Sequence, residues 1–144
     1  MTKEKQRSTL RDKFLSEMKR IKKRVTPARL SMFKILNSAH SPITAETFVK
    51  KIGVNKTTAY RDINLFLKNG FIEEADFGDG IIRYEIKERK HHHHLVCLRC
   101  KKVQDISFNE NLEWEEKQIR KYQGFQVIRH DLEFFGYCHK CTPS

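Results

Sequence analysis

The chain has 144 residues, 38% of them apolar and 33% charged, which fits a globular protein with a modest core in one ordinary domain or two small ones. No apolar run approaches the roughly 20 residues that span a bilayer. Residues 1–5 lack the apolar region of a signal peptide, so we expect a cytoplasmic protein with no membrane partner.

Positive charge is concentrated in the first half of the chain. Residues 1–70 contain 17 Lys or Arg and 5 Asp or Glu, whereas residues 71–144 contain 12 and 13. A basic half joined to a near-neutral half favours contact with a polyanion, most simply nucleic acid. A solvated basic surface is the alternative that charge alone leaves open.

Four helices and a β-hairpin are predicted in the first half. Apolar residues that recur every three or four positions indicate the helices, and Thr26 and Thr44 are placed as N-caps. Chain order gives helices over residues 9–24, from Thr26-Pro27 to a break at His40-Ser41-Pro42, over 45–52 and over 56–69, then strands over 71–77 and 81–86. Gly78-Asp79-Gly80 between the two strands is a hairpin signal.

The fourth predicted helix has two distinct faces. Ala59, Ile63 and Phe66 cluster on one side, and polar side chains occupy an arc of about 140° on another. Such side chains reach phosphates and base edges. A helix-turn-helix followed by a hairpin is a winged helix, whose expected partner is double-stranded DNA. The candidate DNA-binding residues are Arg24, Lys56, Thr57, Tyr60, Arg61 and Asn64.

The second half is predicted to be a small α/β unit. Strands are expected over residues 91–98, 103–106, 125–130 and 132–137, with a helix over 111–123. A unit this small is hard to stabilise alone, so zinc and dimerisation would both help. The predicted fold class is α+β, with a winged helix-turn-helix domain over 1–87, a hinge over 88–90 and a metal-binding α/β domain over 91–144.

All four cysteines fall into two CxxC pairs, Cys97/Cys100 and Cys138/Cys141. Thiols stay reduced in the cytoplasm, so the pairs indicate a structural Zn²⁺ bound by four thiolates. The gap of about 37 residues exceeds that of a compact zinc ribbon, so the metal must join two remote segments. Buried or redox-active cysteines are the alternative.

Four consecutive histidines occur in the sequence KHHHHLVCLRC over residues 90–100. An expression tag is one explanation, although tags usually lie at a terminus and are longer. Successive side chains of a strand point to opposite faces, so the run predicts two half-sites that each need further ligands. The candidates are Glu85, Asp105, Glu113 and His130, a donor set that suits zinc, iron, manganese or nickel. Alternatively, one histidine pair only hydrogen-bonds or faces solvent.

The sequence resembles the ferric uptake regulator family of metal-dependent transcription repressors. The resemblance covers nearly the whole chain and is carried by Val25-Thr26-Pro27-x-Arg29, Thr58-Ala59-Tyr60-Arg61, residues 91–100 and residues 138–141. It implies an N-terminal winged helix, a C-terminal α/β dimerisation domain, structural zinc on the four cysteines and no enzymatic activity. It also implies that Tyr60 and Arg61 lie at DNA.

The resemblance assigns two further metal sites. A regulatory site at the hinge would use Glu85, His92, His94 and Asp105. A third site, within the dimerisation domain, would use His91, His93, Glu113 and His130. Metal at the hinge would fix the angle between the DNA-binding domains and the dimer core, which would match two operator half-sites.

This chain departs from the family's pattern at three places. The hinge site usually takes a histidine where Pro42 stands, and the nearest histidine is His40, which is therefore a further candidate ligand. His93 stands where many members have aspartate, which makes the third site richer in nitrogen. The link into the recognition helix, residues 52–56, is several residues shorter than usual.

We therefore expect a homodimeric metal-responsive repressor of metal uptake genes. Fe²⁺ is the family's commonest effector, the HHHHLVC run resembles some zinc-responsive members, and Glu85 with Asp105 leaves Mn²⁺ and peroxide sensing open. A zinc-dependent hydrolase is a rival, because open His/carboxylate sites activate water, but no separate catalytic base is evident. A zinc-stabilised interaction module would bind DNA with an affinity indifferent to added metal.

Overall fold

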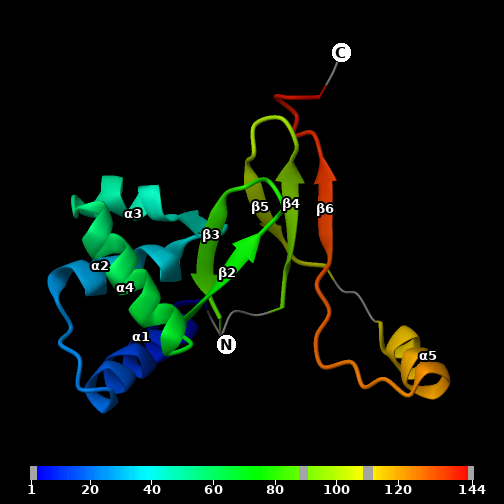
Figure 1. The fold of residues 1–144 in the computed structure, drawn as a ribbon, viewed down its shortest axis with the longest axis horizontal. Coiled ribbons are helices and arrows are strands. Elements are labelled where there is room, and N and C mark those ends of the chain that lie inside the picture. Colours follow the sequence, from blue (N-terminus) through cyan, green and yellow to red (C-terminus); the bar gives the residue numbers. More distant parts are fainter. Residues whose placement is uncertain (1–2, 88–90, 109–111, 143–144) are drawn as a thin grey trace. The chain divides into compact units, whose positions relative to one another are not determined.

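The computed structural model describes residues 3–87, 91–108 and 112–142, with side chains from Thr9 onward (Figure 1). The chain divides into two compact units, Met1–Arg89 and Lys90–Ser144. The predicted hinge at residues 88–90 lies outside the described residues. Within the described part of the chain, no helix is both long enough and apolar enough to cross a membrane.

Four helices build most of the first unit: α1 over Lys3–Arg20, α2 over Pro27–Ser38, α3 over Ala45–Ile52 and α4 over Lys56–Lys68. Both predicted N-caps are confirmed, because the hydroxyls of Thr26 and Thr44 accept hydrogen bonds from backbone N–H groups of the first turns. Asn55, for which no cap was predicted, caps α4 by accepting from the N–H of Thr58 at 2.8 Å. Each cap satisfies a donor that the helix itself leaves unpaired.

Helix α1 ends earlier than its predicted range of 9–24. Lys22 adopts the left-handed conformation, φ 53°, and the N–H of Lys23 bonds to the carbonyl of Met18 at 2.9 Å. This bonding pattern terminates helices and is usually formed around glycine. Residues 22–24 consequently form an exposed turn beyond the helix instead of its last turn.

A three-stranded antiparallel sheet completes the first unit. The predicted hairpin is present as β2, Ile72–Asp76, and β3, Ile82–Ile86, and the short β1, Ile43–Thr44, adds to the other side of β3. Figure 1 shows α2, α3 and α4 gathered along one side of this hairpin. Strand β1 was not predicted, because two residues carry no readable periodicity.

The core of the first unit lies among these helices and the sheet. Phe14 of α1 stacks on Phe33 of α2, with ring centroids 4.3 Å apart, and meets Phe66 of α4 edge-on at 5.4 Å. The predicted apolar face of α4 is confirmed, since Ala59, Ile63 and Phe66 are fully buried. Burial of this face turns the opposite, polar face of α4 outward.

The second unit is built on another three-stranded sheet, ordered β5-β4-β6. Its strands are β4, His93–Cys97, β5, Val103–Ile106, and β6, Glu133–Gly136; β4 is antiparallel to β5 and parallel to β6. Helix α5, Glu113–Gln123, lies beyond the end of this sheet in Figure 1. None of its residues, all of which the structure describes, is buried.

The prediction of a strand over residues 125–130 is wrong. Those residues pair with no strand among the described parts of this chain. Two of their apolar side chains are exposed, Phe125 at 63% and Ile128 at 84%. A strand requires a neighbour for its backbone N–H and C=O groups, and apolar alternation alone does not supply one.

Candidate metal sites and nucleic-acid interface

The four cysteine sulfurs gather in the second unit. Their Sγ atoms all lie within 4.8 Å of one another, and those of Cys100 and Cys138 are 3.8 Å apart. A tetrahedron with Zn–S bonds of about 2.3 Å has S–S edges of about 3.8 Å. All four thiols are free of disulfides, so the cluster fits a zinc ion in both donor chemistry and size.

Two backbone turns and one strand pairing position these sulfurs. The N–H of Lys101 donates to the carbonyl of Cys97 at 2.9 Å, and the N–H of Cys141 donates to the carbonyl of Cys138 at 2.7 Å. The parallel pairing of β4 with β6 sets Cys97 opposite Gly136, two residues before Cys138. Segments about 40 residues apart in the chain therefore end side by side.

The surroundings make the thiols chemically different. Backbone N–H groups of Cys100 and Cys138 lower the pKa of Cys97 to about 6, because they stabilise its thiolate. The N–H of Cys138 lies 3.4 Å from that sulfur. Burial, followed by hydrogen bonds with the neighbouring thiols, raises the pKa of Cys141 to about 12. Cys97 thus ionises more readily than Cys141, which must release a proton to become a ligand.

The four histidines alternate between two faces as predicted, although the strand expected over 91–98 begins only at His93. The rings of His91 and His93 lie 4.6 Å apart, and those of His92 and His94 lie 5.0 Å apart, measured between centroids. His94 and Asp105 are cross-strand partners, and Nε2 of the histidine is 3.9 Å from Oδ1 of the carboxylate. The imidazoles of His92 and His94 therefore lie on the same face of the sheet as the Asp105 carboxylate of β5.

The other two candidates for the regulatory site belong to the first unit. Glu85 is buried on β3, where it pairs with Glu73 across the hairpin. His40 is exposed in the turn after α2. Both the strand position and the loop position agree with the elements expected from the sequence.

Three histidines converge on the other face of β4. His130, which follows α5, lies 5.2 Å from His91 between ring centroids. His93 is only 1% exposed and packs 4.9 Å from the Phe108 ring. The Phe108 ring makes the side of the group next to His93 apolar.

The carboxylate beside His130 is one that the sequence reasoning missed. Oε1 of Glu116 is 3.1 Å from Nδ1 of His130. The predicted ligand Glu113 lies three residues earlier on α5, and its carboxylate is 4.0 Å from the Lys117 ammonium. Residues three apart share a helix face. The three-residue spacing of Glu113 and Glu116 was therefore the sequence signal that either glutamate could approach His130.

The polar face predicted for α4 is exposed. Five of the six candidate DNA-binding residues lie on this helix, all exposed: Lys56, Thr57, Tyr60, Arg61 and Asn64. The sixth, Arg24, is exposed in the turn before α2. Cations, hydroxyls and an amide on one convex helix face are suited to phosphates and base edges.

A buried ion pair beneath this face was not anticipated. Asp62 is 2% exposed, and its Oδ1 accepts a hydrogen bond from Nε of Arg29 at 2.9 Å. Asp62 lies three residues after Ala59 and one before Ile63, so it interrupts the apolar stripe of α4. An acidic residue within an apolar stripe was the sequence signal for this pair.

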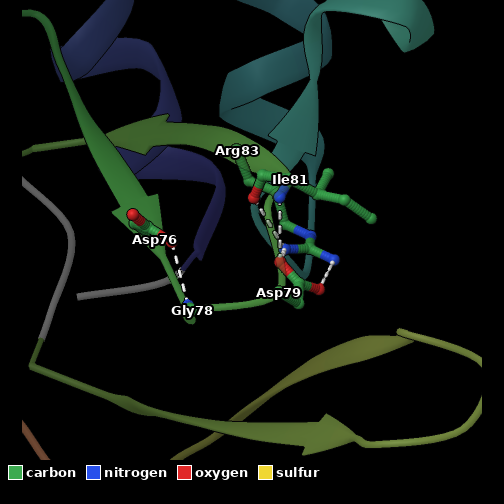
Figure 2. Close-up of polar contacts among 5 residues, drawn as sticks. All are labelled: Asp76, Gly78, Asp79, Ile81 and Arg83. Atoms are coloured by element: carbon green, nitrogen blue, oxygen red, sulfur yellow. Dashed lines mark hydrogen bonds and ion pairs between the residues drawn. The ribbon is translucent and has the colours of Figure 1, made fainter.

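The β2–β3 hairpin is acidic, unlike the helices. Residues 72–86 include five Asp or Glu and one Arg. Figure 2 shows Arg83 bound to both carboxylate oxygens of Asp79, at 3.1 and 2.8 Å, and to the carbonyl of Ile81 at 3.0 Å. The Asp76 carboxylate accepts from the N–H of Gly78 at 2.9 Å and shapes the same tip. The positive charge of this unit therefore lies on its helices and turns.

Comparison with known proteins identifies the family. The model of the ferric uptake regulator family matches residues 20–135. The chain is 34% identical over 121 residues to the ferric uptake regulation protein of Yersinia pestis, covering 80% of this chain and 81% of that protein. This chain belongs to the ferric uptake regulator family. It is accordingly a metal-responsive transcriptional regulator and not an enzyme.

Other proteins similar to this chain have names that give different regulatory roles. The peroxide-responsive repressor PerR of Staphylococcus epidermidis is 26% identical over 126 residues, 84% of this chain and 83% of that protein. The solved Helicobacter pylori ferric uptake regulator, described as having three functional metal binding sites, superposes with TM-score 0.79 over 96% of this chain and 95% of its own, at 22% identity. A zinc-bound manganese uptake regulator gives TM-score 0.63 at 31% identity, over 80% and 90%. The predicted fold class, a winged helix followed by a small α/β dimerisation domain, is confirmed.

Proposed function

We propose that this regulator is a cytoplasmic homodimeric repressor that binds operator DNA when a divalent metal occupies its regulatory site. The observation that carries the proposal is the two-faced strand β4. On one face His94 lies beside Asp105 and next to His92, and three residues further on Cys97 belongs to the sulfur cluster. The proposed regulatory ligand His94 therefore lies on the same short strand as Cys97, a ligand of the proposed structural zinc.

The regulatory site is proposed to combine residues of both units. His92, His94 and Asp105 come from the second unit, and Glu85 and His40 from the first. A metal held from both units would restrict the angle between them. It shifts the DNA-binding equilibrium only by its difference in affinity for the two geometries.

The remaining metal assignments follow from donor chemistry. The four cysteines are proposed to hold structural Zn²⁺, which favours tetrahedral thiolate ligands. The third site is proposed to bind another divalent ion through His91, His93, Glu113 and His130. Glu116, bonded to His130, would fix the orientation of that imidazole as a carboxylate partner does.

Operator DNA is proposed to meet the polar face of α4 together with Arg24. Two copies of α4 in a homodimer would read two half-sites in successive major grooves. The exposed apolar residues of the second unit, among them Phe125 and Ile128, provide the surface for that homodimer. The proposed targets are metal uptake genes.

Fe²⁺ is the proposed effector, because the Yersinia pestis relative at 34% identity is a ferric uptake regulation protein. Zn²⁺ and Mn²⁺ are alternatives, since the related manganese uptake regulator is 31% identical and imidazole–carboxylate sites accept all three metals. The PerR relative favours peroxide sensing as a second candidate function. Hydrogen peroxide would then release DNA from the Fe²⁺-loaded protein but leave the Mn²⁺-loaded protein bound.

The test is DNA binding by protein that holds only its structural zinc, under anaerobic conditions. The probe is a duplex that the parent protein selects from a random library in the presence of all four candidate metals. Separate titrations with Fe²⁺, Mn²⁺, Zn²⁺ and Ni²⁺ should raise affinity, most steeply for the effector. Affinity indifferent to every metal would overturn the proposal in favour of a zinc-stabilised binding module.

His40 is tested with the same probe. His40→Ala should lower metal affinity and uncouple metal from DNA binding, while zinc content and dimerisation stay unchanged. A variant that responds to metal as the parent does would remove His40 from the site and leave Glu85 as the first unit's ligand.

A further inference from the structure

One side chain ties the recognition helix to the basic turn that precedes α2. Nε of Arg29 donates to Asp62 at 2.9 Å, while Nη1 of the same guanidinium donates to the backbone carbonyl of Arg24 at 2.8 Å. The Arg29 side chain is 14% exposed and that of Asp62 is 3% exposed. Only a guanidinium can hold a carboxylate and a carbonyl at once in this fixed fork geometry.

Both ends of this tie adjoin groups suited to DNA. Asp62 directly follows Tyr60 and Arg61 along α4 but is buried. Because the three residues belong to one helix, fixing the Asp62 side chain also fixes where the Tyr60 and Arg61 side chains project. At the other end, Arg24 closes the exposed turn formed with Lys22 and Lys23. No acidic residue occurs in the sequence between Glu17 and Glu46, so the turn and the helix that follows it contain only positive charges.

The conformation of Lys22 is an independent observation. Its φ of 53° lies in the left-handed region, which glycine adopts readily and other residues rarely do. A lysine at this position gives the turn an additional positive charge where glycine would satisfy the backbone better. Such an exception is grounds for a functional hypothesis.

We propose that Arg29 and Asp62 are positioning residues for DNA recognition. Their ion pair holds the basic turn of residues 22–24 at a fixed place relative to the reading face of α4. The turn then binds phosphates that flank the bases read by α4, without the ordering cost that a loose turn would incur. The inference rests on the proposed binding of operator DNA.

The hairpin provides a matched control for this arrangement. Arg83 also combines one carboxylate, that of Asp79, with one backbone carbonyl, that of Ile81 (Figure 2). Both side chains of this pair are equally buried, at 5% and 6% exposure. The Arg83–Asp79 pair lies within the acidic hairpin and includes no residue of a basic turn. Its loss therefore shows what removing a buried arginine ion pair does to the protein by itself.

The experiment compares Arg29→Lys with Arg83→Lys in the full chain loaded with Zn²⁺ and Mn²⁺. Lysine keeps the charge but cannot hold both partners. The probe is the duplex selected by the parent protein, and affinity is measured across a series of KCl concentrations. Melting temperature is recorded for each variant.

We expect both substitutions to lower the melting temperature, whereas only Arg29→Lys changes the salt dependence. When a cation no longer binds its phosphate, the slope of log affinity against log salt falls by about 1, which is about tenfold in affinity per decade of salt. Arg24→Ala should add little in the Arg29→Lys background. It should have its full effect beside Arg83→Lys, because distant sites add independently.

The tie is overturned if Arg29→Lys keeps the parent's slope and the full effect of Arg24→Ala. It is equally overturned if Arg83→Lys changes the slope to the same extent. Should Arg29→Lys fail to fold, Asp62→Asn, which keeps the shape of the side chain but removes the negative charge that binds Arg29, is expected to fold and show the reduced slope, and an unchanged slope there refutes the proposal. A parent protein that selects no DNA overturns the proposed function itself, and the tie with it.

Discussion

Arg61 and Asp62 are neighbours on α4 whose side chains lie in opposite environments, one exposed and one buried. The exposed member of such a pair can be replaced without loss of packing, so its contribution to DNA binding can be measured separately from stability. His93 and His94 on β4 also differ in environment, because they point to opposite faces of the strand, His93 buried and His94 half-buried. Single substitutions can therefore divide the roles of adjacent residues.

Arg61→Ala should weaken operator binding by roughly 1–3 kcal/mol, the cost of losing a specific base contact. Tyr60→Phe should also weaken it, through loss of a hydroxyl. Both side chains are exposed, so melting temperature and metal content should match the parent. Fluorescence anisotropy with the selected duplex measures the effect. Lys34→Ala removes an exposed cation from α2 as the control, and an equal loss there would indicate a general charge effect.

His94→Ala should abolish metal-activated DNA binding, whereas His93→Ala should reduce it less completely. The two imidazoles lie on opposite faces of β4, and His94 is the one beside Asp105. Metal titration followed by DNA binding measures the difference. Because His93 is buried, its variant's melting temperature must be measured alongside. Equal loss of the metal response in both variants would contradict this division of roles.

At the scale of elements, starts of helices could be predicted because their causes are local. A capping side chain such as Thr26 or Thr44 acts within three residues of its own position. The end of α1 was harder to predict, because it depends on Lys22 adopting a conformation that glycine usually takes. Strand β1 and the absent strand over 125–130 depend on whether a pairing partner exists, which no local pattern reveals.

The sulfur cluster holds two elements together, so losing one ligand should unfold the sheet it anchors. Cys97→Ser leaves three thiolates, and structural zinc contributes folding energy directly. Circular dichroism and NMR should show the second unit unfolded and the first unit retained. His139→Ser alters an exposed residue between two ligands and should leave the fold intact. A dimeric Cys97→Ser protein with the parent's melting temperature would refute the four-thiolate assignment.

At the scale of the whole molecule, the second unit exposes several large apolar side chains. Trp114, Tyr122, Phe125 and Ile128 are all more than 60% exposed, at 67%, 68%, 63% and 84%. Larger exposed apolar surfaces of this kind mark interaction sites. The segment over 125–130, which lacks a strand partner within the described chain, is part of that surface.

Ile128→Glu should shift the protein from dimer to monomer. A charge placed in an apolar interface loses solvation without gaining a partner. Analytical ultracentrifugation over a concentration series measures the shift. Ile82→Glu, at 38% exposure in the first unit, is the control and should leave association unchanged. A variant as dimeric as the parent would show that the dimer uses another surface.

The candidate sites were predictable to different degrees, for a physical reason. The two faces of the histidine run follow from the alternation of side chains along one strand. The grouping of the four cysteines follows from their CxxC spacing and their shared preference for zinc. The Arg29–Asp62 pair and the bond from Glu116 to His130 depend on tertiary packing between segments far apart in the chain. Sequence periodicity contains no information about such distances.

The parallel pairing of β4 with β6 has a consequence for how the protein matures. The paired residues His94 and Glu133 are about 40 positions apart, so a long loop must close before these strands can pair. The hairpin of β2 and β3 closes a loop of only a few residues. Non-local pairing is slow. Cys138 and Cys141, which follow β6, reach the other two cysteines only when β6 pairs with β4. The rate at which newly made chains become competent regulators should therefore depend on the zinc supply, while the first unit folds at the same rate with or without it.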